Sequence, residues 1–170
     1  KEMELDEYTL WLEPAGKNAS ILQNYIENFA SRAGTHSFPP HLTLIGGISS
    51  ETPDIQKIVR SLAESRQPFI VSNTVPDSSD QFYKSVFIQY VSEELITFNK
   101  EAQRVFSKSY EYEPHVSLLY GKVSSVLAET FVSELQKEPL ILDFEVRRMS
   151  LWHAKGEYTE WKKLETFPLG

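Results

Sequence analysis

Two stretches of the chain are almost alike, and this repetition limits the folds that the chain can adopt. PPHLTLIGG occupies residues 39–47, and EPHVSLLYG occupies residues 113–121. Each places a histidine directly after a proline and a hydroxyl-bearing residue two positions later. His41 and His115 are 74 residues apart, and the chain contains only four histidines. A fold for this sequence therefore has to give both segments equivalent surroundings.

The elements predicted around the two segments also repeat their order. Alternating apolar residues predict strands, and apolar residues three and four positions apart predict helices. In each half a strand, a helix, the histidine strand, a second helix and a further strand follow one another. The predicted strands are residues 7–14, 41–48, 68–75, 84–91, 115–121, 140–146, 147–154 and 161–169, and the predicted helices are residues 18–34, 52–66, 93–108 and 124–138.

Local signals predict where these elements begin and end. We expect Asn18 to cap the first helix and Gly34 to end it. The other expected boundaries are Thr52 as cap and Pro53 as first residue of the second helix, Ser124 or Ser125 as cap of the last helix, and a turn over residues 76–80.

An internal duplication explains this order better than a chance resemblance between two half-buried strands. FPPHLTLIGG and YEPHVSLLYG share four identities in ten positions, and the order of elements repeats on both sides of them. We therefore expect an α+β fold with two mainly antiparallel sheets around a central cleft and helices packed outside. Residues 1–170 form a single bilobal domain in this interpretation, with pseudo-repeat halves at about 1–76 and 82–170.

Composition excludes several classes of protein. The absence of cysteine excludes a disulfide framework, a zinc–thiolate site, an iron–sulfur cluster and a thiol nucleophile. The net charge is −7 and the basic residues are scattered, so we expect no long nucleic acid as partner. No apolar run approaches the ~20 residues that cross a bilayer, so we expect no membrane partner. The sequence has no heptad pattern, so it leaves oligomerisation open. We expect a monomer that is cytoplasmic or nucleocytoplasmic.

The paired motifs suit acid–base chemistry on a phosphate. In a strand, residues i and i+2 share a face, so His41 projects with Thr43, and His115 with Ser117. If the two copies pack about a pseudo-twofold axis, these four side chains meet in one cleft. Hydroxyls donate to phosphate oxygens, and imidazole is both acid and base near neutral pH. Hydrolysis of a cyclic phosphate ester needs one imidazole to activate water and another to protonate the departing ribose oxygen.

A zinc site is the competing interpretation of the same histidines. His36, His41 and His115 offer three nitrogens, but no acidic residue stands at ligand spacing within either motif, and no H-E-x-x-H occurs. A cyclic diester also holds its own leaving group in place. We therefore expect neither a metal nor another cofactor.

The two motifs resemble the paired H-x-[ST]-x signatures of the 2H phosphoesterase superfamily. Over its full length the chain is similar to the compact cyclic phosphodiesterases of the fungal and plant type. Further similarity lies in W-L-x-P at residues 11–14, FYKSVFIQ at residues 82–89, and SLW at residues 150–152 followed by W-K at residues 161–162.

This resemblance implies a fold of two lobes around a water-filled cleft that holds the four motif side chains. It implies hydrolysis of ADP-ribose 1″,2″-cyclic phosphate to the 1″-phosphate, in tRNA splicing, and of nucleoside 2′,3′-cyclic phosphates to 2′-phosphates. His41 and His115 would be the catalytic acid–base pair, with Thr43 and Ser117 as phosphate ligands. Within the pair, we expect His115 to activate water and His41 to protonate the leaving oxygen.

Three aromatic residues are candidates for substrate binding. Tyr120 stands where the first copy has Gly46, at the end of the motif strand, and there it either closes over the substrate or packs in the core. Trp11 and Trp152 are candidate platforms for a nucleobase, with core packing as the alternative. We expect no catalytic role for the remaining histidines, His36 and His153.

Two other functions compete with a cyclic phosphodiesterase. One lies within the same superfamily: cleavage of 2′-5′-linked oligonucleotides or of RNA ends. The other is a non-catalytic nucleotide-binding protein, which the presence of both histidines and both hydroxyls disfavours.

Overall fold

The structure is a computed structural model that describes residues 4–170. Its elements, in chain order, are β1 (Leu5–Ala15), α1 (Lys17–Ala33), β2 (Leu42–Ser49), α2 (Ile55–Glu64), β3 (Phe69–Ser78), the 3-10 helix η1 (Phe82–Lys84), β4 (Val86–Val91), α3 (Glu93–Val105), β5 (His115–Leu119), α4 (Ser125–Leu135), β6 (Phe144–Gly156), the 3-10 helix η2 (Tyr158–Glu160) and β7 (Lys162–Pro168).

The strands form two antiparallel groups that are joined at both sides. The sheet order is β1-β2-β5-β4-β3-β6-β7, and a further pairing of β1 with β6 closes it into a ring. The strands β2, β1, β6 and β7 pair over long stretches, as do β3, β4 and β5. Between the groups, β2 meets β5 at the pair Leu42–Val116, and β3 meets β6 over residues 69–71. The expected α+β, bilobal, mainly antiparallel fold is confirmed, although its two sheets are continuous.

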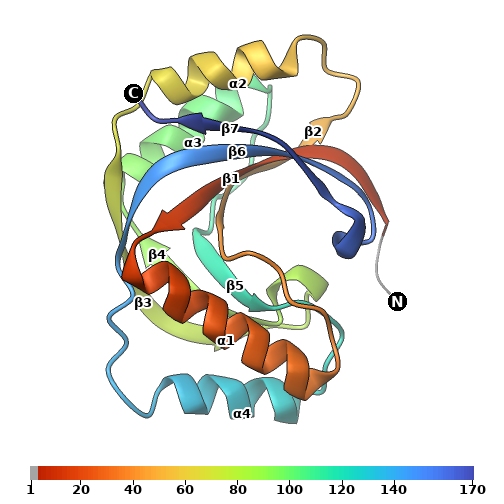
Figure 1. The fold of residues 1–170 in the computed structure, drawn as a ribbon, viewed down its shortest axis with the longest axis vertical. Helices are drawn as coiled ribbons and strands as arrows, with labels where there is room; N and C mark the ends of the chain where they lie inside the picture. The colour runs from red at the N-terminus through yellow and green to blue at the C-terminus, as the bar shows by residue number, and fades with distance from the viewer. Residues whose placement is uncertain (1–3) are drawn as a thin grey trace.

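The helices lie outside the strands. Figure 1 shows α2 and α3 on one side of the molecule and α1 and α4 on the opposite side, with the strands between them. α2 packs on β6 and β7 and α3 packs on β2, whereas α1 packs mainly on β5, and α4 packs on β3 and β4. Among the described residues, no helix is long and apolar enough to cross a membrane.

Each lobe combines both halves of the sequence. β6 and β7, from the second half, complete the group that contains β1 and β2, and β3, from the first half, joins β4 and β5. The helices are exchanged as well, because α1 contacts β5 and α3 contacts β2. The two motif strands, β2 and β5, consequently lie next to each other at the junction of the lobes.

Some helix ends match the sequence signals and others do not. Gly34 ends α1 in the left-handed conformation, and Ser124 caps α4 by accepting a hydrogen bond from the Leu127 amide. Asn18 is not the cap of α1, which begins at Lys17, and its amide instead donates to the Asp143 carbonyl at 2.6 Å.

The predicted start of α2 is also wrong. Thr52 bonds back to the Ser49 carbonyl through both its amide and its hydroxyl, so it closes a turn after β2. Pro53 follows that turn, and the helix begins only at Ile55, after Asp54 in a left-handed conformation.

Two strand predictions need correction. Residues 140–146 and 147–154 are not separate strands, because pairing with β1 continues from Glu145 to Gly156 and makes β6 one strand. The predicted turn at residues 76–80 lies partly in β3, which runs through Pro76 to Ser78. Pro76 is tolerated because β6 pairs with β3 only at residues 69–71, so the missing amide faces an unpaired edge there.

Candidate active site

The register of β2 and β5 brings the four motif side chains onto one face. Leu42 pairs with Val116 in antiparallel fashion, and both side chains are fully buried in the core. The alternate residues on each strand point the other way. This register sets His41 opposite Ser117 and Thr43 opposite His115, so the histidines occupy one diagonal and the hydroxyls the other.

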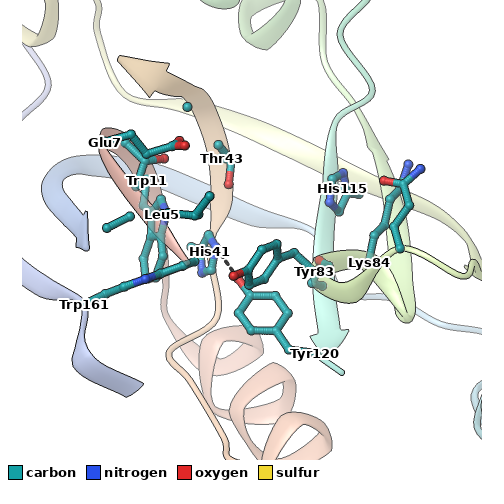
Figure 2. A pocket seen from close by; sticks show the side chains of 15 residues that line it. Leu5, Glu7, Trp11, His41, Thr43, Tyr83, Lys84, His115, Tyr120 and Trp161 are labelled. Atoms are coloured by element: carbon teal, nitrogen blue, oxygen red, sulfur yellow. Dashed lines mark hydrogen bonds between the residues drawn. The ribbon is translucent and has the colours of Figure 1, made fainter. Parts of the chain in front are cut away.

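The face carrying these residues lines a cavity of about 260 Å³. Figure 2 shows His41 and Thr43 on one side and His115 on the other. All four motif residues line the cavity, as the paired motifs predict. The other aromatic and polar residues in its wall include Trp11, Tyr83, Tyr120, Trp161, Glu7, Gln81 and Lys84.

A backbone carbonyl fixes each imidazole. His41 Nδ1 lies 2.8 Å from the Pro39 carbonyl oxygen, and His115 Nδ1 lies 2.8 Å from the Glu113 carbonyl oxygen. A carbonyl only accepts, so each Nδ1 carries a hydrogen and each neutral ring has its lone pair on Nε2. The repeated proline holds the residue before it in an extended conformation, which aims that carbonyl at the ring.

An aromatic residue on the neighbouring strand contacts each histidine. Trp11 pairs with Thr43, and Phe87 pairs with Ser117, so the two aromatics occupy equivalent positions in the two lobes. Trp11 stacks flat on His41, with ring centroids 3.5 Å apart and planes 3° apart. Phe87 meets His115 edge-on, with centroids 5.6 Å apart at 70°.

Tyr120 reaches across the lobe junction to His41. Its hydroxyl lies 3.3 Å from His41 Nε2 (dashed in Figure 2), and its ring stacks on Phe38 with centroids 3.7 Å apart. Burial raises the pKa of Tyr120, so the hydroxyl keeps its proton and donates to the Nε2 lone pair. Gly46, the counterpart in the first copy, gives His115 no such neighbour.

The two hydroxyl residues of the motifs differ in their present contacts. The Ser117 hydroxyl donates to the Tyr83 carbonyl at 2.7 Å, so it has to rotate before it can donate to a phosphate. The Thr43 side chain projects into the cavity, while its backbone carbonyl accepts a hydrogen bond from the Tyr112 hydroxyl at 2.8 Å.

Burial keeps both imidazoles neutral at pH 7. His41 is 5% exposed, and desolvation lowers its pKa to about 3, against the opposing effect of the Pro39 carbonyl. Desolvation also lowers the pKa of His115, opposed by the Glu113 carbonyl and assisted by the positive charge of Lys84. The nearby His115 also contributes to lowering the pKa of His41.

Sequence reasoning missed Lys84, which brings a positive charge to the cavity wall. Its Nζ lies 3.1 Å from the Glu113 carboxylate and 4.5 Å from the centroid of the Phe87 ring, beside His115. Tyr83 and Trp161 were also missed as site residues. All three lie within segments noted for their family resemblance, FYKSVFIQ and W-K, but nothing in their local pattern directs them toward a cavity.

Trp152 does not line this cavity. It packs behind Trp11, with ring centroids 4.2 Å apart, and its indole Nε1 donates to the Ser150 hydroxyl. It lines a separate groove together with Pro39 and Lys163. Of the candidate aromatic residues, Trp11 and Tyr120 therefore share the cavity with the histidines, and Trp152 supports Trp11 from the far side.

The other two histidines lie outside the cavity wall. His36 exchanges backbone hydrogen bonds with the Tyr158 hydroxyl, and His153 Nε2 forms an exposed hydrogen bond with the Asp6 carboxylate at 2.8 Å. Within residues 4–170, no group of three or more His, Cys, Asp or Glu side chains is arranged to hold a metal ion.

A bilobal antiparallel fold with an H-x-[ST] motif from each lobe in one cavity defines the class of two-histidine phosphoesterases. Solved structures share this fold. E. coli LigT complexed with phosphate has a TM-score of 0.57 at 14% identity, covering 98% of this chain and 99% of that one. E. coli LigT complexed with NADP+ has a TM-score of 0.62 at 12% identity, and the match covers 98% of this chain and 99% of that one. The protein TT0787 of Thermus thermophilus has a TM-score of 0.60 at 13% identity, and the match covers 96% of this chain and 97% of that one.

The family follows from the sequence itself. The model of the 2′-5′ RNA ligase superfamily matches residues 8–157, and the chain therefore belongs to that superfamily. This places it among phosphoesterases and RNA ligases, enzymes that act on phosphodiester bonds. A search of curated protein sequences gave no match.

Proposed function

We propose that the protein is a metal-independent cyclic phosphodiesterase that uses two histidines as acid and base. Its substrates are ADP-ribose 1″,2″-cyclic phosphate, opened to the 1″-phosphate, and nucleoside 2′,3′-cyclic phosphates, opened to 2′-phosphates. One observation carries the proposal: both Nδ1 atoms are hydrogen-bonded to carbonyls at 2.8 Å, so Nε2 is the reactive nitrogen of each ring, beside two hydroxyls in one cavity.

The reaction breaks one bond to phosphorus and forms another. His115 Nε2 takes a proton from water as the water oxygen bonds to phosphorus. The bond from phosphorus to one ribose oxygen breaks, and that oxygen takes the proton from His41 Nε2. Thr43 and Ser117 donate to the non-bridging oxygens, where negative charge grows in the transition state.

The surroundings of the two rings support this division of roles. Lys84 favours the neutral form of His115, which a general base requires. His41 has to gain a proton before it acts as acid, and the negative charge of a bound phosphodiester raises its pKa from the low value of the empty cavity. The Tyr120 hydroxyl, which donates to Nε2 of the neutral ring, then gives way to the leaving oxygen of the substrate.

A second candidate is favoured by the family match: cleavage of 2′-5′-linked oligonucleotides or of RNA ends. A cavity of about 260 Å³ and a net charge of −7 favour a small cyclic ester over a long strand. In a cyclic ester, moreover, the leaving oxygen and the phosphate stay attached to the same ribose after the ring opens.

Phosphorus NMR of the products tests the proposal. The protein is incubated in excess EDTA with adenosine 2′,3′-cyclic phosphate, ADP-ribose 1″,2″-cyclic phosphate and a 2′-5′-linked diadenylate. We expect only adenosine 2′-phosphate from the first and only the 1″-phosphate from the second. Preferential cleavage of the diadenylate would support the second candidate, and tight binding without turnover would indicate a nucleotide-binding protein.

A further inference from the structure

The cavity that holds the histidines continues into a second groove. A space of about 350 Å³ shares Thr43, Gly46, Gln81, Lys84 and His115 with it. The cavity alone, at about 260 Å³, is smaller than the roughly 300–1,000 Å³ typical of small-molecule sites. A cyclic ribose phosphate fits the first space, and a larger substrate extends into the second.

The far wall of the groove is a loop that the protein holds in place. Gln103 Oε1 accepts from the Tyr110 amide at 3.1 Å, and the amide of Asn99 donates to the Tyr110 hydroxyl at 3.0 Å. The same Asn99 amide donates to the Leu44 carbonyl of β2 at 2.8 Å, and Asn99 is 1% exposed. Because the buried Asn99 side chain bonds to both Tyr110 and Leu44, it joins this loop to β2, and the groove is formed before any ligand binds.

The groove offers the groups that recognise a nucleoside. The Tyr110 side chain lines it and is 44% exposed, so a ring face is available for a base to stack on. Glu111 and Glu113 line it too, and carboxylates accept hydrogen bonds from sugar hydroxyls. Glu111 repels a phosphate inside the groove, whereas the ammonium group of Lys84, at the boundary of the two spaces and 3.1 Å from the Glu113 carboxylate, attracts one.

We propose that this groove binds a nucleoside joined through phosphate to the 5′ oxygen of the ribose that carries the cyclic phosphate, with the base on Tyr110 and the linking phosphate at Lys84. The inference rests on the proposed function, because the cyclic phosphate has to lie between the histidines. It predicts that a substrate with two nucleosides has a higher kcat/KM than a cyclic mononucleotide. It also assigns the preference to residues outside the H-x-[ST] motifs.

The test compares three substrates that differ only at the 5′ side: adenosine 2′,3′-cyclic phosphate, its 5′-phosphate, and adenylyl-(3′-5′)-adenosine 2′,3′-cyclic phosphate. For the wild type we expect kcat/KM to rise with each extension, by about tenfold for the step that adds the base. Tyr110→Leu should abolish that last step, Tyr110→Phe should retain it, and Glu111→Gln should reduce it several-fold.

Leu164→Ala is the matched control. Leu164 is 43% exposed, on β7, and lines neither space, so its substitution should leave all three rates and their ratios unchanged. Equal kcat/KM for the three substrates, or an unaltered ratio in both Tyr110→Leu and Glu111→Gln, would overturn the inference while leaving the proposed function intact.

Binding separates the two proposals if no cyclic substrate is turned over. Calorimetry then compares adenosine 2′-phosphate with adenylyl-(3′-5′)-adenosine 2′-phosphate. Tighter binding of the longer probe by the wild type, lost in Tyr110→Leu or reduced in Glu111→Gln, supports the groove even where the catalytic proposal has failed. Equal affinity for both probes rejects it.

Discussion

The two halves of the site share a motif but differ in enclosure. His41 lies between Trp11, which stacks flat on it, and the hydroxyl of Tyr120. His115 is less buried and has Phe87 edge-on and Lys84 close by. The two copies of the motif therefore share the groups that orient the rings, whereas the neighbours that set the protonation of the rings differ.

This difference explains how two identical side chains take opposite roles. An acid and a base of one reaction need different proton affinities when the substrate is bound. On the His115 side, a fixed positive charge favours the neutral ring. On the His41 side, no lysine or arginine lines the cavity among the described residues, so the charge of the substrate itself controls the proton.

Loss of either imidazole should have the largest effect. His41→Ala and His115→Ala each remove one partner of the proton transfers, so kcat should fall by roughly 10²–10⁴ with the fold retained. Steady-state hydrolysis of adenosine 2′,3′-cyclic phosphate, with circular dichroism as a check on folding, measures this. His153→Ala, on the surface, is the control; near-normal turnover in either cavity variant would contradict the mechanism.

The second effect is on stability, and it distinguishes the two rings. The folded pKa of His41 is about 3, below the unfolded value near 6.5, so the unfolded chain binds the extra proton between these values. Stability should therefore fall by ~1.4 kcal/mol per pH unit on acidification through this window. Urea unfolding from pH 6.5 to 4 should show a shallower pH dependence in His41→Gln than in the wild type, and a smaller change in His115→Gln.

Equal pH dependence in the wild type and His41→Gln would show that His41 is not desolvated as described. A larger change for His115→Gln than for His41→Gln would reverse the order of burial between the two halves.

The pH dependence of catalysis should differ between the free enzyme, which kcat/KM reports, and the substrate complex, which kcat reports. Both histidine pKa values are lowered, so the protonated form that serves as acid is lost below pH 6.5 in the free enzyme. The alkaline limb of kcat/KM should therefore lie below 6.5, and that of kcat at higher pH, since bound phosphodiester raises the pKa of the acid. A kcat/KM limb above 6.5 would contradict the electrostatic account.

A smaller effect tests the positive charge of Lys84, which distinguishes the surroundings of His115 from those of His41. Lys84→Met removes a positive charge beside His115, so the pKa of His115 should rise toward its ordinary value. Titration of the histidine ring protons by NMR measures the shift. His41 serves as the internal reference, and a shift at His41 larger than that at His115 would place the influence of Lys84 on the wrong ring.

Much of the site could be predicted because strand periodicity determines which side chains share a face. The spacing of His41 and Thr43, repeated at His115 and Ser117, was enough to place all four in one cavity once the two strands paired. The α+β class followed from the alternation of periods, and caps such as Ser124 follow from chemistry within a single turn.

Other features depend on contacts that no local pattern records. Trp152 lies behind Trp11 because β6 pairs with β1, a partner more than a hundred residues away. Trp161 reaches the cavity because β6 and β7, from the second half, join the lobe of β1 and β2, and Lys84 reaches it because η1 packs on β5. The continuous strand through Arg147-Arg148 likewise reflects pairing with β1 rather than the propensity of the segment itself.

The double variant tests the central claim most directly, that the two histidines act as one catalytic pair. Hydrolysis of adenosine 2′,3′-cyclic phosphate is measured for His41→Ala, His115→Ala and the combined variant. Groups that act as a unit are strongly non-additive, so the combined variant should be no more than a few-fold slower than the slower single variant. Losses that multiply in the combined variant would show that the histidines act independently and would contradict the account.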